Sequence, residues 1–235
     1  MENRTKIALI PAYMPDEALV EISTELKERE FSVIVIDDGS GADFDDVFER
    51  ASKYAKVIRL KVNKGKGFAL KKGFRFIRAS FAPPYTLVTV DADGQHKIAD
   101  VINVYNYAAK YPEDVVIGCR RLERDDPIKS RIGNNITNFL YKVTTGSKLS
   151  DTQTGLRAFS DGSVDIAIKS KGNRYEYEIN SLLDFSRIRK IREIPIETVY
   201  INNNRATHFK PIKDSAVIYS QFFTNKFSKN NKNKE

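Results

Sequence analysis

The sequence has 235 residues, of which 41% are hydrophobic, so it is long and apolar enough for one large domain with a full core. No run approaches the roughly 20 apolar residues of a membrane span, and the first residues lead straight into a strand-like run, so we expect no secretory signal. A single cysteine, Cys119, excludes an internal disulfide and fits a reducing compartment. The formal net charge of +8 predicts an anionic partner, which leaves nucleic acid, phospholipid and phosphorylated substrates open.

Apolar runs alternate with amphipathic stretches through the first half of the chain. The predicted strands are 7–10, 32–36, 57–60, 85–90 and 115–118. The predicted helices are 17–29, 44–55 and 97–110, and a further helix begins at the loop 63–67 and ends near residue 79. The run 32–36 is continuous and β-branched, as in buried parallel strands. This alternation predicts an α/β fold with a doubly wound, mostly parallel sheet.

The pattern changes beyond residue 118. The predicted elements there are helices at 128–145, 164–170 and 176–186, a strand at 156–159, an extended hairpin-like segment at 190–201 and an amphipathic terminal helix beyond 211. Because no Pro/Gly-rich linker divides the chain, we predict a single domain over 1–225. The tail 226–235 holds four lysines and one glutamate, and we expect it to be disordered.

Four predicted strands end in loops with ligand-binding chemistry, and the carboxyl ends of parallel strands meet at one edge of a sheet. The loops are Pro-Ala-Tyr at 11–13, Asp-Asp-Gly-Ser at 37–40, Asn-Lys-Gly-Lys-Gly at 63–67 and Asp-Ala-Asp-Gly-Gln at 91–95. Asp37 or Asp38 could accept hydrogen bonds from a nucleobase or ribose, and Lys66 offers a cation beside backbone that glycines leave accessible. Asp91 and Asp93 offer hard oxygen ligands to a divalent cation shared with a diphosphate.

Each of these loops also has an ordinary structural explanation. An Asp-x-Asp pair alone is more often a turn and a helix cap. The loop 63–67 fits a solvated turn equally well, and it lacks the glycine spacing of a dinucleotide fingerprint or a P-loop. The order of the motifs is therefore more informative than any one of them.

Five segments occur in a characteristic order: 35–40, 63–70, 91–96, 118–120 and 150–157. Together they resemble glycosyltransferase family 2, and more narrowly the polyprenyl-phosphate glycosyltransferases that use dolichyl or undecaprenyl phosphate. The resemblance covers about residues 5–219. It implies the GT-A fold, with a nucleotide-sugar half at 1–118 and an acceptor half at 119–225 that carries a helical and hairpin extension. It also implies an inverting, metal-dependent transfer of a hexose from a nucleoside-diphosphate sugar to a lipid phosphate, in the modification of cell-envelope glycans.

The resemblance also implies roles for individual residues. It places the nucleotide on Pro11, Ala12, Tyr13, Asp37, Asp38, Lys66, Asp91 and Ala92, and Mg²⁺ or Mn²⁺ on Asp91, Asp93 and Gln95. The implied catalytic residues are Asp93, Asp151 and Arg131. A divalent ion would neutralise the charge that develops on the departing diphosphate. We expect His96 to support this site or to start a helix rather than to act as a further metal ligand.

A phosphate acceptor is already anionic near neutral pH, so the enzyme must attract and orient it rather than deprotonate it. Arg120 and Arg131 match positions that resemble phosphate-binding arginines, whose planar fork suits bidentate contact. The segment 205–210 resembles a mobile loop that closes over the phosphates. It would contribute Arg205, His208 and Lys210, although many relatives have lysine in place of His208.

Two roles stay open for Asp151: a base or orienting group at the reaction centre, and a turn cap. The donor also stays open, with UDP-glucose or a related UDP-hexose favoured over GDP-mannose. Many relatives continue into membrane-spanning helices, whereas this sequence ends in a basic tail, so we expect a cytoplasmic protein at the inner face of the cell membrane. It would be held there peripherally by Phe222, Phe223, Phe227 and the tail lysines, or through a partner protein. Packing of these phenylalanines on the domain is the alternative.

Other functions remain as alternatives. One is a family 2 transferase that acts on a glycan or protein hydroxyl. Another is a catalytically inactive relative that serves as a scaffold, although the presence of Asp91, Asp93 and Gln95 argues against it. A third is a basic nucleic-acid-binding module. Because the positive charge is spread along the chain and no nucleic-acid-binding motif occurs, we expect no nucleic acid partner.

Overall fold

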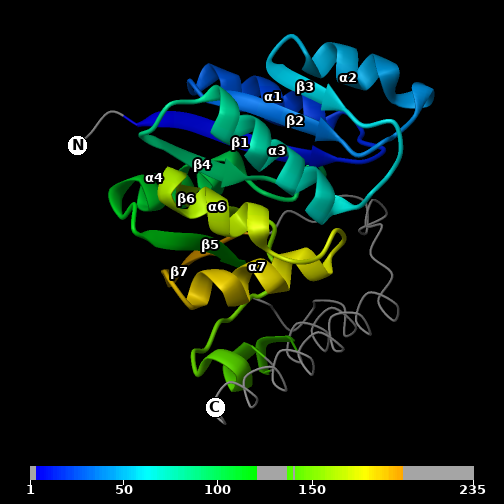
Figure 1. Ribbon diagram of the computed structural model, residues 1–235. Coiled ribbons are helices and arrows are strands. Elements are labelled where there is room, and N and C mark those ends of the chain that lie inside the picture. The colour runs from blue at the N-terminus through cyan, green and yellow to red at the C-terminus, as the bar shows by residue number, and fades with distance from the viewer. Residues whose placement is uncertain (1–3, 121–136, 140, 198–235) are drawn as a thin grey trace.

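The computed structural model describes residues 4–120, 137–139 and 141–197. Within them the strands are β1 (Thr5–Ala12), β2 (Ser32–Asp37), β3 (Ala55–Arg59), β4 (Tyr85–Thr89), β5 (Asp114–Arg120), β6 (Arg157–Ser160) and β7 (Lys190–Ile196). They form one sheet in the order β3-β2-β1-β4-β6-β5-β7 (Figure 1). All described strand pairs are parallel except those of β6, which runs antiparallel to both β4 and β5. The mostly parallel sheet predicted from the sequence is confirmed.

Helices cover both faces of this sheet. They are α1 (Ala18–Glu28), α2 (Asp45–Ala51) after the short 3-10 turn η1 (Ala42–Phe44), α3 (Lys66–Ser80), α4 (Ile98–Lys110), α6 (Asp161–Lys169) and α7 (Glu176–Ser186), and residues 137–139 and 141–145 are also helical. Alternate residues of β1 point to opposite faces, so Ile7 belongs to the core cluster that includes residues of α3, α6 and α7, whereas Ala8 belongs to the cluster that includes residues of α1, α2 and α4. Burial on both faces explains why the strands are nearly continuous apolar runs. Among the described helices none has the length and apolarity needed to cross a bilayer.

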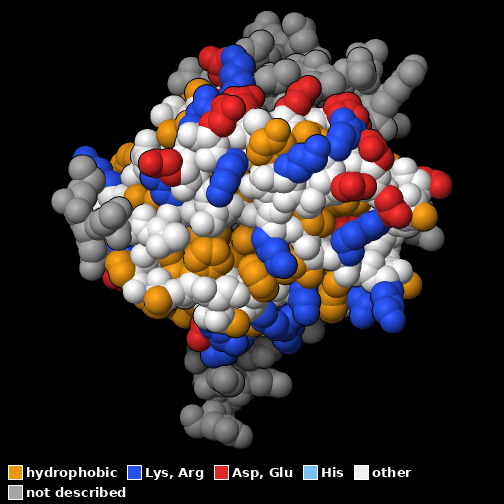
Figure 2. Space-filling model, turned by 90° about the horizontal axis from the view of Figure 1, so that it is seen from above, with side chains coloured by type: hydrophobic (Ala, Val, Ile, Leu, Met, Phe, Trp, Pro, Cys, Tyr) orange, Lys and Arg blue, Asp and Glu red, His pale blue; other side chains and the backbone are white. Residues whose placement is uncertain are grey.

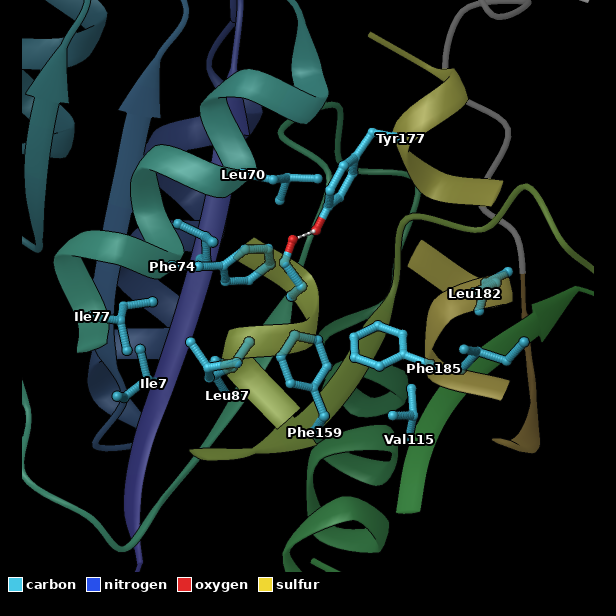
Figure 3. Packing of buried hydrophobic residues seen from close by; sticks show 14 of the residues in the cluster. Ile7, Leu70, Phe74, Ile77, Leu87, Val115, Phe159, Tyr177, Leu182 and Phe185 are labelled. Carbon is cyan, nitrogen blue, oxygen red and sulfur yellow. Dashed lines mark hydrogen bonds between the residues drawn. The ribbon is translucent and has the colours of Figure 1, made fainter. Parts of the chain in front are cut away.

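An aromatic cluster joins α3, β6 and α7 on one face of the sheet (Figure 3). The ring of Phe159 lies between Phe74 and Phe185, with centroid separations of 5.6 Å and 5.1 Å. The Tyr177 hydroxyl donates a hydrogen bond of 2.7 Å to the carbonyl oxygen of Ala167. Each such aromatic pair contributes about 0.5–1.5 kcal/mol beyond the area it buries. The cluster therefore fixes α3 and α7 relative to the middle of the sheet.

The surface seen from above in Figure 2 carries acidic side chains among the basic ones over much of its area. Some charges of the described residues are paired near the surface. Arg50 binds Glu17 of the loop before α1, and Arg59 of β3 binds Asp45 of α2. Such exposed pairs contribute little stability. On the face shown, the mixture of signs differs from the continuous basic stripe of a nucleic-acid-binding face.

One sequence prediction needs correction, and one pairing was not predicted. The predicted helix 44–55 ends at Ala51, because residues from Ala55 onward join the sheet as β3. The described part of the predicted hairpin 190–201 is the strand β7, which pairs in parallel with β5. The buried strand β5 has β6 on one side and needs a hydrogen-bonding partner on the other, which β7 supplies. The start of the predicted helix 128–145, the end of the hairpin, the terminal helix and the tail lie outside the described residues.

Candidate active site

Asp91 lies just beyond the carboxyl end of β4, at the edge of the sheet where β1 and β2 also end. Its Oδ1 lies 2.6 Å from Nζ of Lys66, the first residue of α3, and its Oδ2 lies 3.6 Å from Nε2 of His96. Burial disfavours the charged carboxylate, but Lys66 and His96 outweigh it and hold the pKa of Asp91 well below its ordinary range. The structure therefore places an ionised carboxylate at the predicted position.

The pKa of Asp93 is shifted in the opposite direction, upward. Burial and the neighbouring charge of Asp91 raise its pKa, although the backbone N–H of Gln95 donates a 3.1 Å hydrogen bond to its Oδ1. The two aspartates therefore disfavour each other's charge, and a divalent cation would relieve that repulsion. Within the described residues no three His, Cys, Asp or Glu side chains form a metal-binding cluster. Two carboxylates with an amide suit a hard cation such as Mg²⁺, which usually keeps several sites for water and phosphate oxygens.

Lys66 binds a second carboxylate that the sequence analysis missed. Its Nζ lies 2.7 Å from Oε1 of Glu178, in the first turn of α7. Burial disfavours the ammonium, but Asp91 and Glu178 outweigh it and raise the pKa of Lys66 far above its ordinary value. One signal could have revealed Glu178: it is an acidic residue between the apolar Tyr177 and Ile179, and a buried carboxylate needs a cation.

The loop 151–155 packs directly against Asp91. A Cβ placed on Gly155 would lie 2.4 Å from Oδ2 of Asp91, so a larger residue there would have to displace the Asp91 carboxylate. Thr89, the last residue of β4, donates a 2.7 Å hydrogen bond from its hydroxyl to the carbonyl oxygen of Gly155. Two motifs that are 60 residues apart in the sequence are thus in contact, as the predicted site requires.

The predicted nucleotide-binding aspartates organise their own loops. Asp38 accepts hydrogen bonds from the backbone N–H groups of Lys64 (2.9 Å) and Gly65 (2.7 Å), and Asp37 forms an ion pair of 2.9 Å with Arg59. Burial raises the pKa of Asp38 in spite of these bonds. Gly65 has φ +102°, and a Cβ there would lie 2.4 Å from the carbonyl oxygen of residue 173. Both carboxylates hold loops at this edge of the sheet, and their contact with a nucleotide stays a prediction.

The loop 11–13 joins the same edge. The backbone N–H of Asp38 donates to the carbonyl oxygen of Ala12 (2.8 Å), and that of Met14 donates to the Ser40 hydroxyl (2.8 Å). Pro11 and Ala12 are buried at the end of β1, whereas the ring of Tyr13 is exposed. Ala92 and Gln95 are half-buried in the loop after β4. An exposed aromatic ring therefore lies at this edge of the sheet.

Arg120, at the end of β5, is bound by a fully buried carboxylate. Its Nε donates to Oδ2 of Asp151 (2.7 Å) and its NH2 to Oδ1 (3.3 Å), and Oδ1 also accepts from the backbone N–H of Gln153 (3.1 Å). Although burial disfavours its charge, Asp151 raises the pKa of Arg120. Because both carboxylate oxygens are occupied, this geometry favours an orienting role for Asp151 over a role as a base.

Arg157 has a structural role, because its guanidinium is bonded within the protein. Its guanidinium donates to the carbonyl oxygens of Thr154 (2.9 Å) and Glu178 (2.7 Å) and to the Ser181 hydroxyl (3.0 Å), and only 5% of the residue is exposed. It therefore joins the loop 151–155 to α7. Apart from Arg120, the residues predicted to bind phosphate lie outside the described residues: Arg131, Arg205, His208 and Lys210.

Comparison with protein families gives one match that covers most of the chain. Residues 7–167 match the model of Glycosyl transferase family 2. An uncharacterized protein of Methanocaldococcus jannaschii is 32% identical over 207 residues, which cover 84% of this chain and 83% of that protein. The UDP-N-acetylglucosamine–dolichyl-phosphate N-acetylglucosaminyltransferase of Methanococcus voltae is 27% identical over 232 residues, covering 88% of this chain and 90% of that enzyme.

A third relative has a different named acceptor lipid. The undecaprenyl-phosphate 4-deoxy-4-formamido-L-arabinose transferase of Salmonella choleraesuis is 27% identical over 172 residues, covering 68% of this chain and 50% of that enzyme.

Among solved structures, glucosyl-3-phosphoglycerate synthase of Mycobacterium tuberculosis in complex with UDP superposes with a TM-score of 0.70 at 18% identity, covering 95% of this chain and 80% of that chain. The same enzyme with Mn²⁺, UDP and phosphoglyceric acid gives a TM-score of 0.67 at 19% identity, covering 96% of this chain and 78% of that chain. This likeness shows the GT-A fold.

Proposed function

The chain belongs to glycosyl transferase family 2 and is a glycosyltransferase, and on that premise we propose that it moves a hexose from a UDP-sugar to a polyprenyl phosphate. The observation that carries the donor half is the cluster of Asp91, Asp93 and Lys66 at the carboxyl edge of the sheet, where ligands of α/β folds bind. The relatives support the proposal by name: the Methanococcus enzyme acts on dolichyl phosphate, and the Salmonella enzyme on undecaprenyl phosphate.

In the donor half, Lys66 would bind the diphosphate, and Asp91, Asp93 and Gln95 would hold Mg²⁺ or Mn²⁺. The cation supplies positive charge that stabilises the departing diphosphate. The structures of the mycobacterial synthase contain UDP with Mn²⁺ and, in one complex, UDP-glucose, which supports this assignment and a UDP-hexose donor. The loops 11–13 and 37–40 would hold the nucleoside.

In the acceptor half, Arg120 would attract the lipid phosphate, with Asp151 fixing its guanidinium. An oxygen of that phosphate attacks the anomeric carbon as the bond from that carbon to the diphosphate breaks, so the configuration inverts. No base is needed, because the attacking oxygen is already anionic. This agrees with the full engagement of Asp151 by Arg120. The lipid acceptor implies that the protein works at the inner face of the cell membrane, by direct contact or through a partner protein.

The test is transfer of radiolabel from UDP-glucose, UDP-N-acetylglucosamine or GDP-mannose into organic-extractable dolichyl or undecaprenyl phosphate, with Mg²⁺, Mn²⁺ or a chelator. We expect label from one UDP-sugar that depends on the cation and is absent with Asp93→Asn. Cation-dependent hydrolysis of one donor without lipid label would instead point to a glycan or protein hydroxyl as the acceptor. Absence of both activities with every donor would contradict the proposed donor class.

A further inference from the structure

Glu178 links the two sides of the candidate active site through Lys66. The ammonium of Lys66 lies 2.7 Å from Oε1 of Glu178 and 2.6 Å from Oδ1 of Asp91, so it is shared between two carboxylates. Glu178 is 8% exposed, and a buried charge is tolerated only when it is paired. One partner of Lys66 is thus a proposed metal ligand, and the other has no role in the reaction as described so far.

The two helices that carry this pair are packed too closely for it to separate freely. Gly67 follows Lys66 and Tyr177 precedes Glu178, and a Cβ on Gly67 would lie only 2.4 Å from the Cβ of Tyr177. The hydroxyl of Tyr177 is itself bound to the carbonyl oxygen of Ala167, as the dashed line in Figure 3 shows. The helix starts therefore hold Lys66 and Glu178 within reach of each other.

Lys66 is one of several charged groups at this place. Asp91 and Glu178 pair with it directly, and the guanidinium groups of Arg120 and Arg157 also attract these two carboxylates. A divalent cation bound by Asp91 would compete with Lys66 for that carboxylate. Lys66 would then keep Glu178 as its remaining partner.

We propose that Glu178 is a positioning residue: it holds Lys66 beside the donor diphosphate when a divalent cation occupies Asp91. Without Glu178, Lys66 pairs with Asp91 alone. This pairing draws the Lys66 ammonium away from the diphosphate and makes it compete with the divalent cation for Asp91. The inference rests on the proposed function, since it takes the ligands to be a nucleoside diphosphate and a divalent cation. If Glu178 were only a source of negative charge, its removal would reduce repulsion and tighten nucleotide binding.

Two variants separate these roles. Glu178→Gln removes the charge and keeps the shape, whereas Glu178→Asp keeps the charge and withdraws it by one methylene. UDP binding is measured by calorimetry at a saturating concentration of Mg²⁺, and Mn²⁺ binding by electron paramagnetic resonance without nucleotide, both on the full chain. We expect each variant to weaken both affinities about tenfold, as loss of a charge-assisted hydrogen bond would do. Thermal melting checks that both variants are folded.

Lys66→Met supplies the background in which Glu178 has nothing to position. There, Glu178→Gln should cause no further loss of UDP affinity and a smaller loss of Mn²⁺ affinity than in the wild-type background. Asp184→Asn is the matched control, because Asp184 is an acidic residue of the same helix that pairs at the surface with Arg187. Both affinities of this control should equal those of the wild type.

Three results would overturn the inference: tighter UDP binding by Glu178→Gln, unchanged affinities in Glu178→Asp, or an equal loss of Mn²⁺ affinity in both backgrounds. The last result would make Glu178 a metal ligand or a general source of charge. If the wild type binds Mn²⁺ but not UDP, the proposed function fails, and the Mn²⁺ measurements still decide the role of Glu178. If it binds neither ligand, both proposals fall.

Discussion

The charged residues of the candidate site are held mainly by one another. Arg120 is fixed by Asp151, and Lys66 by Asp91 and Glu178. Such pairing orients a cation before the ligand arrives, so the ordering entropy is spent in folding rather than in binding. Loss of one partner should therefore change the affinity for the ligand which the oriented cation contacts.

Asp151→Asn should weaken the acceptor side and spare the donor side. The amide keeps the size of the carboxylate but loses its charge, so Arg120 is held less firmly. We expect the KM for lipid phosphate to rise about tenfold, in line with loss of a charged hydrogen bond, while the dissociation constant for UDP stays within about twofold. Steady-state kinetics and calorimetry measure the two quantities. A fall in kcat together with loss of an acidic limb from the pH profile would show that Asp151 acts as a base instead.

Cys119 should be inert toward alkylation in the folded protein. Burial raises the pKa of its thiol to about 11, and the residue is only 9% exposed. The reactive thiolate is therefore scarce at pH 8, and its fraction rises about tenfold per pH unit up to that pKa. We expect slow iodoacetamide labelling at pH 8 and rapid labelling in guanidinium chloride, as followed by mass spectrometry. Equal rates in the two conditions would place the thiol at an accessible site.

At the scale of elements, the contact between α3 and α7 determines where the donor lysine lies. Gly67 permits it, because the backbone of α3 approaches the ring-bearing Cβ of Tyr177. Lys71 strengthens the contact by donating to the carbonyl oxygen of Gly172 (2.5 Å) and to the side chain of Asn173 (2.9 Å). The start of α3 is therefore set by packing with a helix from the second half of the chain.

Gly67→Ala should destabilise the protein even though alanine favours helices. The added methyl group would lie 2.4 Å from the Cβ of Tyr177, so the two helices must move apart. Overpacking of this kind costs about 1–3 kcal/mol, equivalent to a fall in Tm of about 2–12 °C for a chain of this size. Lys72→Ala, at an exposed position of the same helix, is the control and should change Tm by less than about 2 °C. An unchanged Tm for Gly67→Ala would mean that the contact is looser than the structure shows.

Local pattern was enough to predict most of the strands and helices, because each carries its own period of apolar residues. The loops around Asp38, Lys66 and Asp91 were also predictable, since they follow parallel strands that end at one edge. Pairing between distant parts of the chain was not predictable. The sequence indicates that 190–196 is extended, but not that this strand pairs with β5. Glu178 was missed for the same reason, because its partner is more than a hundred residues away.

At the scale of the whole molecule, the candidate site draws on strands from both halves of the chain within one sheet. A ligand that bridges β2, β4 and the start of α3 would hold the folded state together and leave the unfolded state unaffected. Its binding should therefore be visible as thermal stabilisation.

Addition of UDP with Mn²⁺ should raise Tm. At ligand concentrations of about 100 times the dissociation constant, the stabilisation is about 2.7 kcal/mol, which corresponds to about 5–10 °C for a chain of this length. A chelator should remove most of the shift, and Asp93→Asn should show little of it. Differential scanning fluorimetry measures all three. An equal shift by UDP with and without chelator would argue against a cation in the donor site.

The reversed direction of β6 has a consequence for how such an enzyme can change its substrate. β5 ends, and β6 begins, at the edge that carries Asp91, and the two strands are neighbours in the sheet. The segment that joins them in the sequence, which includes Arg131 and Asp151, therefore has both of its anchor points at that edge. Such a segment can be lengthened, shortened or exchanged between paralogues as a cassette without rethreading a strand. Recruitment of a new acceptor would then need one recombination event rather than a redesigned scaffold.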